Sequence, residues 1–176
     1  GEELGLPQAD LDHEDLRDPF GIAFWPEFKG RDGSRTPMPW IAGAEHAGFT
    51  RGGKPWLPVT EAHRALAADR QEMRPDSTLN VWRRCLALRR LHPELKQGGA
   101  GQVDEDGPVL SFTRGDRLVA VFNLSCGRAE YILPPGRYSA IEIPLPGPAA
   151  LLDGSPEDGI RVGLPPLGAL LALRDG

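Results

Sequence analysis

The sequence predicts an α+β chain, in which an irregular segment and two helices precede an antiparallel β-sandwich. Three observations lead to this fold class. The first 60 residues are rich in Gly, Pro and aromatic residues and show no sustained periodicity. Residues 60–98 show the helical spacing of apolar residues. Residues 103–176 hold short apolar or β-branched runs separated by turn residues, a pattern typical of strands.

The irregular segment is expected to be a structured loop, because it carries too many large rings for a solvated tail. One short helix is expected over residues 12–18, ending before Pro19. The rings are expected to pack against another part of the protein. They are Phe20, Phe24, Trp25, Phe28, Trp40, Phe49 and Trp56.

Two helices are expected in the next segment. Thr60 suits the N-cap of the first helix, and Pro75 ends it. Asp76 or Ser77 is expected to cap the second helix, whose apolar residues form a wide stripe. Cys85 lies in this stripe and is therefore expected to be a core residue.

Six short strands are expected after a Gly-rich hinge at residues 97–102. Turn residues separate them, which favours a small antiparallel sandwich. One of them, residues 117–124, has apolar residues on both faces. The predicted strands are residues 109–113, 117–124, 130–133, 138–143, 160–163 and 169–173.

Composition excludes several classes of function. The formal net charge of −5 argues against a nucleic-acid partner, which needs a basic face. No apolar run reaches the roughly 18–20 residues of a membrane span. Two cysteines are too few for a disulfide scaffold and favour a reducing, cytoplasmic compartment. The four histidines lack metal-ligand spacing, so no metal site is expected.

The densest cluster of polar residues lies within residues 29–40. Arginine, aspartate and tryptophan on a loop stiffened by proline suit sugar binding. Charged groups hydrogen-bond to sugar hydroxyls, and an indole covers an apolar ring face. The alternative is an ion pair that only shapes the loop, either Arg31 with Asp32 or Arg35 with a carboxylate.

Four sequence motifs in this part of the chain resemble the α-glucosidases of glycoside hydrolase family 13. They read GEELGLP at 1–7, EDLRDP at 14–19, FWPEFKGRDG at 24–33 and RTPMPW at 35–40. The resemblance covers about residues 1–98, and the predicted sandwich follows in the expected place.

The resemblance implies a (β/α)8 barrel followed by an antiparallel β-sandwich called domain C. Residues 1–98 would then be the C-terminal part of the barrel: the end of the last strand, a long loop at the catalytic mouth and the final helices. Residues 103–176 would be domain C. The family's nucleophile and general acid stand on earlier strands, so the resemblance implies no catalytic residue here and an inactive isolated chain.

The resemblance also implies an activity and two substrate-binding residues. The activity is exo-acting, retaining hydrolysis of terminal α-linked glucose from short glucosides. Arg35 would contact a hydroxyl of the terminal glucose, and Glu14 would line the aglycone side. No cofactor is implied, since the calcium sites of some relatives lie on loops outside this chain. The implied partners are an oligosaccharide or α-glucoside substrate and the N-terminal barrel portion, covalent or separate.

Two alternatives remain open from the residues. The sandwich could be a non-catalytic carbohydrate-binding or scaffold module, although residues 103–176 contain no tryptophan for a sugar platform. The chain could also be a self-sufficient hydrolase that uses Glu14 and Asp32, although a loop braces such a pair poorly.

Overall fold

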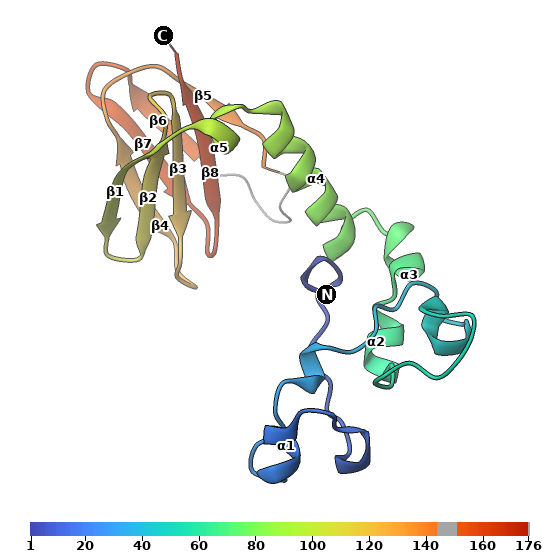
Figure 1. Ribbon diagram of the computed structural model, residues 1–176. Helices are drawn as coiled ribbons and strands as arrows, with labels where there is room; N and C mark the ends of the chain where they lie inside the picture. The colour runs from blue at the N-terminus through green and yellow to red at the C-terminus, as the bar shows by residue number, and fades with distance from the viewer. Residues whose placement is uncertain (144–150, 176) are drawn as a thin grey trace. The chain divides into compact units, whose positions relative to one another are not determined.

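The computed structural model describes residues 1–143 and 151–175 (Figure 1). The chain divides into two compact units, Gly1–Arg83 and Arg84–Gly176. We call them the N-terminal unit and the C-terminal unit and describe each by itself. The boundary between the units in the sequence falls within helix α4 (Thr78–Leu91). The domain boundary expected between residues 98 and 103 stays a prediction.

The N-terminal unit is built from short helical elements joined by loops. A single helix over residues 12–18 was the wrong prediction, because only a 3-10 turn forms there. The α-helix begins at Pro19 instead: the Asp18 side chain accepts a hydrogen bond from the Phe20 N–H, and proline suits the first helical position. The elements are η1 (Glu2–Leu4), η2 (His13–Asp15), α1 (Pro19–Ala23), η3 (Asp32–Ser34), η4 (Glu45–Gly48), α2 (Glu61–Ala65) and α3 (Ala68–Glu72).

The first predicted helix after Thr60 is divided in the structure. The Thr60 cap is confirmed, since its hydroxyl accepts from the His63 N–H at 3.3 Å. The helix does not continue to Pro75, because Ala67 adopts an extended backbone between α2 and α3. The second predicted helix, α4, is confirmed, and the Ser77 hydroxyl accepts from the Asn80 N–H at its start.

The apolar stripe of α4 is only partly buried within this chain. Leu79 is the one residue of the helix that is fully buried. Trp82 and Leu86 are exposed, and Cys85 is half-buried, so the expectation that Cys85 is a core residue was wrong for the chain as described.

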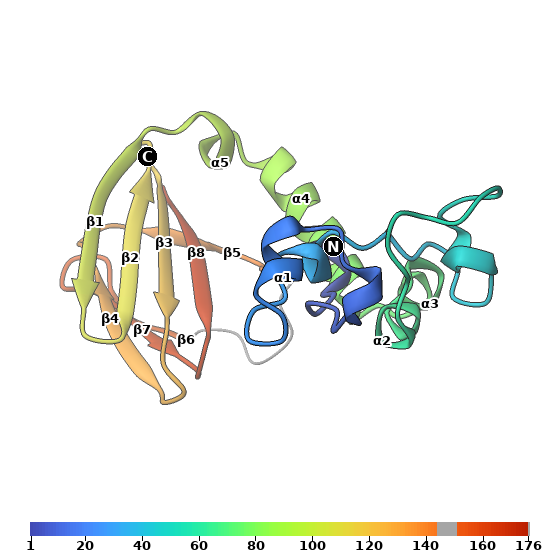
Figure 2. The same cartoon turned by 60° about the horizontal axis from the view of Figure 1, so that its bottom comes forward.

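The C-terminal unit joins the short helix α5 (Glu94–Gln97) to eight antiparallel strands among the described residues. They form a five-stranded sheet in the order β1-β2-β3-β8-β5 and a three-stranded sheet in the order β4-β7-β6 (Figure 2). The strands are β1 (Ala100–Asp106), β2 (Val109–Arg114), β3 (Leu118–Asn123), β4 (Ala129–Leu133), β5 (Tyr138–Ile141), β6 (Leu151–Ser155), β7 (Gly159–Leu164) and β8 (Ala169–Arg174).

All six predicted strands are present, and two further strands were missed. Strand β1 begins at Ala100 and takes up half of the predicted hinge, which was therefore wrong: only Gly98 and Gly99 separate the strand from α5. Val103 is the one large apolar residue of β1, so the sequence lacks the alternation of apolar and polar residues that predicts a strand. The register of β1 against β2 also shifts between Ala100 and Val103. The predicted sandwich extends through residues 144–150 and 176, which lie outside the described residues.

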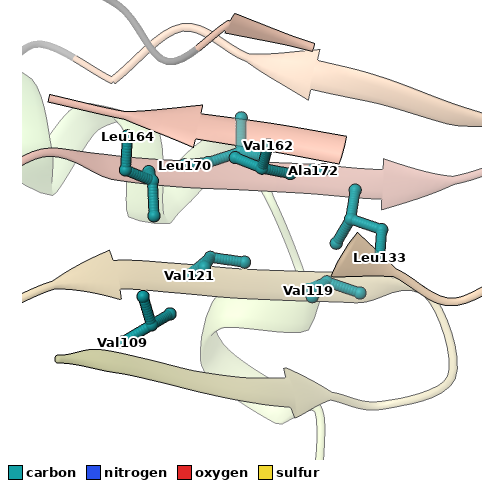
Figure 3. Packing of buried hydrophobic residues seen from close by; sticks show 8 residues of the cluster. All are labelled: Val109, Val119, Val121, Leu133, Val162, Leu164, Leu170 and Ala172. Carbon is teal, nitrogen blue, oxygen red and sulfur yellow. The ribbon is translucent and has the colours of Figure 1, made fainter. Parts of the chain in front are cut away.

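Two apolar clusters use the two faces of the larger sheet. On one face, alternate residues of β3 join residues of the smaller sheet, and Figure 3 shows these side chains gathered together. The opposite face of β3 contributes Leu118 and Ala120, against which Leu88 of α4 and Leu95 of α5 pack. The strand predicted to be apolar on both faces is thus confirmed. The first cluster comprises Val109, Val119, Val121, Leu133, Val162, Leu164, Leu170 and Ala172.

None of the helices in the described ranges is both long enough and apolar enough to cross a bilayer.

Candidate functional site

The polar loop at residues 29–40 is anchored from inside by Asp32. This side chain is 2% exposed. One of its oxygens, Oδ2, accepts hydrogen bonds from the backbone N–H groups of Arg17 and Asp18, at 2.6 and 2.7 Å. Two backbone donors on one buried oxygen satisfy its acceptor capacity, so Asp32 joins two segments of the loop and is not placed as a nucleophile.

The Arg35 guanidinium faces two carboxylates. Its Nη1 lies 3.7 Å from Oδ2 of Asp18 and 3.7 Å from Oδ1 of Asp32. Of the two ion pairs that the sequence left open, Arg31–Asp32 is not formed among the residues the structure describes, whereas Arg35 pairs with the carboxylates of Asp18 and Asp32. Both Arg35 contacts are longer than a hydrogen bond, and the side chain is 51% exposed. Arg35 is therefore oriented by charge while its N–H groups remain available to a ligand.

Asp18 is held in its ionised form beside Arg35. The backbone N–H of Arg31 and then that of Phe20 lower the pKa of the Asp18 carboxyl, and the Arg35 charge adds to this. Hydrogen bonds that favour the charged form of an acid lower its pKa. The carboxylate that orients Arg35 is consequently charged at neutral pH.

The backbone on both sides of the Arg35–Thr36 peptide bond is also fixed. The Trp56 indole N–H donates to the Arg35 carbonyl at 2.9 Å. The Thr36 hydroxyl contacts Nδ1 of His63 at 3.1 Å. A Cβ at Gly33 would collide with the Ala9 carbonyl oxygen, so glycine is needed where these segments cross. The sequence analysis missed His63, because nothing in the sequence links it to a residue 27 positions away.

A hollow opens along this loop in the N-terminal unit. Residues on both sides of Arg35 line it, so the fixed loop forms one of its walls. The lining residues are Gly1, Glu2, Leu6, Pro7, Gln8, Gly33, Ser34, Thr36, Met38 and His63.

Arg35 itself is not among these lining residues, and the other predicted site residues lie apart from the hollow. Glu14 is exposed on η2 and does not line it. Trp40 is half-exposed at the far end of the loop, where its backbone N–H donates to Ala47. Among the described residues, no cluster of three or more His, Cys, Asp or Glu side chains could hold a metal ion.

Comparison with known proteins places the chain in a family. The model of the α-amylase catalytic domain matches residues 1–98. A probable α-glucosidase from Rhizobium meliloti is 43% identical over 145 residues, which are 81% of this chain and 26% of that protein. An oligo-1,6-glucosidase from Parageobacillus thermoglucosidasius is 32% identical over 111 residues, which are 61% of this chain and 19% of that protein.

A solved structure extends the similarity over nearly the whole chain. The α-glucosyl transfer enzyme XgtA superposes with a TM-score of 0.82 and 41% identity, covering 98% of this chain and 31% of that one. The chain therefore spans about a quarter to a third of the length of these two relatives. Because the family model matches more than half of its residues, the chain belongs to the α-amylase family of glycoside hydrolases, and the resemblance to its α-glucosidases is confirmed.

Proposed function

We propose that this chain is the C-terminal part of an exo-acting, retaining α-glucosidase that removes terminal α-linked glucose from short glucosides. The observation that carries the proposal is Arg35: a half-exposed guanidinium oriented by two carboxylates, on a loop whose neighbouring residues Ser34 and Thr36 line a hollow. The name of the Rhizobium meliloti relative, a probable α-glucosidase, supports the same reading.

In the longer protein, residues 1–98 would complete the barrel and residues 103–176 would form domain C. Retaining hydrolysis needs two carboxyl groups about 5 Å apart, one as nucleophile and one as acid and then base. The resemblance assigns both to the preceding part of the barrel. The isolated 176-residue chain is therefore expected to be inactive and to need no cofactor of its own.

Arg35 would bind the terminal glucose by donating hydrogen bonds to a hydroxyl group. A charged hydrogen bond contributes about 1.5–3 kcal/mol, more than a neutral one. Asp18 and Asp32 would limit the side chain to one orientation, so that little conformational entropy is lost on binding. Glu14 would line the aglycone side of the same mouth.

Glucosyl transfer is a second candidate activity. The solved structure at 41% identity over 98% of this chain is titled an α-glucosyl transfer enzyme. Both activities share a glucosyl-enzyme intermediate and differ in whether water or a sugar hydroxyl attacks it. The ratio of transfer product to free glucose at high acceptor concentration distinguishes them.

The experiment that tests the proposal substitutes Arg35 in the full-length enzyme. Arg35→Ala is expected to lower kcat/KM for p-nitrophenyl α-glucoside by about 30- to 1,000-fold, equivalent to about 2–4 kcal/mol, with little change in thermal stability. Arg31→Ala is the matched control, because Arg31 is an exposed arginine of the same loop.

Two results would count against the proposal. An Arg35→Ala enzyme as active as the wild type would make Arg35 a residue that only shapes the loop. Hydrolysis by the purified 176-residue chain would mean that the catalytic carboxylates lie within it.

A further inference from the structure

His63 is the most completely buried ionisable side chain of the N-terminal unit, at 1% exposure. It lies on α2 and contacts two segments distant in sequence. Nε2 lies 2.8 Å from the Pro7 carbonyl oxygen, and Nδ1 lies 3.1 Å from the Thr36 hydroxyl. One imidazole thus connects the start of the chain, the Arg35 loop and a helix.

The chemistry of these partners fixes the tautomer of the ring. The Pro7 carbonyl can only accept, so Nε2 carries the hydrogen. In the neutral imidazole Nδ1 is then an acceptor, and the Thr36 hydroxyl donates to it. His63 therefore holds Thr36 through a directed hydrogen bond in a buried environment.

Thr36 is adjacent to Arg35, which makes this contact relevant to the site. The Arg35 carbonyl is already fixed by the Trp56 indole, and Pro37 is fully buried directly after Thr36. The hydrogen bond from the Thr36 hydroxyl to His63 adds a side-chain anchor between these two fixed points. Neither His63 nor Thr36 makes the ion pairs that orient the guanidinium itself.

We infer that His63 is a positioning residue for the substrate-binding arginine: its Nε2-protonated ring fixes Thr36 and thereby the backbone from which Arg35 projects. The inference rests on the proposed role of Arg35. A shift of about 1 Å in a positioned group is enough to weaken its action substantially. The ring acts through Thr36 and does not touch the substrate.

Two pairs of substitutions in the full-length enzyme separate the contacts. Thr36→Val keeps the shape of the side chain and removes the hydroxyl, whereas Thr36→Ser keeps the hydroxyl. The amide oxygen of His63→Asn can take the place of Nδ1, and the amide N–H of His63→Gln can take the place of Nε2–H. Only the serine and asparagine variants therefore retain a hydrogen bond at Thr36.

Within each pair, one variant is expected to raise KM and the other to keep it near the wild-type value. Thr36→Val and His63→Gln raise KM for p-nitrophenyl α-glucoside by about tenfold with little change in kcat, the effect of losing one hydrogen bond in binding. Thr36→Ser and His63→Asn stay within about threefold of the wild-type KM. Equal KM values within each pair would overturn the inference.

A control addresses loss of stability. Asn123 is buried in the C-terminal unit, where its side chain donates to the Gly127 and Pro165 carbonyls. Asn123→Ala also removes buried hydrogen bonds and is expected to lower the melting temperature without raising KM. If it raises KM as much as Thr36→Val, the KM effect reports stability and the inference fails.

The Arg35→Ala background distinguishes failure of this inference from failure of the proposed function. If Arg35→Ala alone has no effect, the proposed function is wrong. If Arg35→Ala has its expected effect and Thr36→Val raises KM by a further tenfold on top of it, His63 acts independently of Arg35 and the inference is wrong. If His63 acts through Arg35, Thr36→Val is expected to raise KM no further in the Arg35→Ala background.

Discussion

The two units of the chain are stabilised in different ways. The C-terminal unit joins eight buried apolar residues from both sheets in one cluster. The buried cluster of the N-terminal unit contains three, Leu11, Leu16 and Leu57. Buried polar side chains show the opposite distribution. Of the six in the described residues, the N-terminal unit holds Asp32, His63, Gln71 and Ser77, and the C-terminal unit holds Ser111 and Asn123.

The exposed apolar residues differ as well. All four tryptophans lie in the N-terminal unit, and Trp40, Trp56 and Trp82 are at least 42% exposed. The Phe20 ring contacts that of Phe24 in a tilted arrangement and that of Phe28 edge-on, at centroid distances of 4.4 and 5.3 Å, yet all three rings are exposed. The N-terminal unit therefore uses hydrogen bonds to fix the loop that carries Arg35, whereas the C-terminal unit is held mainly by apolar packing.

The distribution of tryptophan allows the units to be followed separately. Tryptophan fluorescence reports the N-terminal unit, and circular dichroism near 218 nm mainly reports the strands, all of which lie in the C-terminal unit. Urea denaturation of the 176-residue chain with both probes is expected to give two midpoints. Coincident transitions would mean that the units unfold cooperatively.

The largest effect on stability is expected from the sheet core. Leu164 is 1% exposed between the sheets, so Leu164→Ala should lower the free energy of unfolding by about 2–5 kcal/mol in the circular dichroism transition. The fluorescence transition should change little. Leu167→Ala is the control, because Leu167 is 68% exposed three residues later. Similar losses for both variants would contradict an apolar core at Leu164.

An intermediate effect is expected from a buried polar group of the N-terminal unit. Gln71 donates to the Leu4 and Leu66 carbonyls and accepts from the Leu79 N–H. Gln71→Leu leaves these groups without partners and should cost about 1–3 kcal/mol in the fluorescence transition. Glu72→Gln, which changes only an exposed ion pair with Arg83, should cost less than about 1 kcal/mol. Equal losses of unfolding free energy in Gln71→Leu and Glu72→Gln would mean that buried hydrogen bonds do not stabilise this unit more than an exposed ion pair does.

The sequence predicted the C-terminal unit more completely because its local signals agree with its packing. Alternation in β3 and turn residues between strands follow directly from a two-faced sheet. Strand β1 escaped prediction because Val103 is its one large apolar residue, so its sequence carries no such alternation. In the N-terminal unit, the break between α2 and α3 contains no Gly or Pro from which it could be predicted. Ala67 is extended because its surroundings, rather than its own preference, determine its backbone.

The candidate site was predictable only in part. Residue types and a family resemblance led to Arg35 and its loop, and the structure gives it two carboxylate neighbours. The resemblance also led to Glu14, whose role stays a prediction. The contribution of His63 was not predictable, because a hydrogen bond between residues 36 and 63 depends on the tertiary fold and leaves no local pattern.

The smallest effect concerns the charge of Asp18 and the pH dependence of the N-terminal unit. Backbone N–H groups of Arg31 and Phe20 lower the pKa of this carboxyl in the folded state. An acid with a lowered pKa when folded stabilises the fold above its unfolded pKa, and this stabilisation is lost as pH falls through the folded pKa. The fluorescence midpoint in urea should therefore fall between about pH 5 and pH 3.

Asp18→Asn should flatten this pH dependence and leave the circular dichroism transition unchanged. An asparagine can still cap α1 by accepting from the Phe20 N–H, so the helix itself should persist. Asp12→Asn is the matched control, since Asp12 precedes η2 without a side-chain capping bond. The control should keep the wild-type pH dependence. If Asp12→Asn flattens the pH dependence of the fluorescence midpoint as much as Asp18→Asn does, that dependence reflects net charge. The hydrogen bonds to Asp18 would then not be its cause.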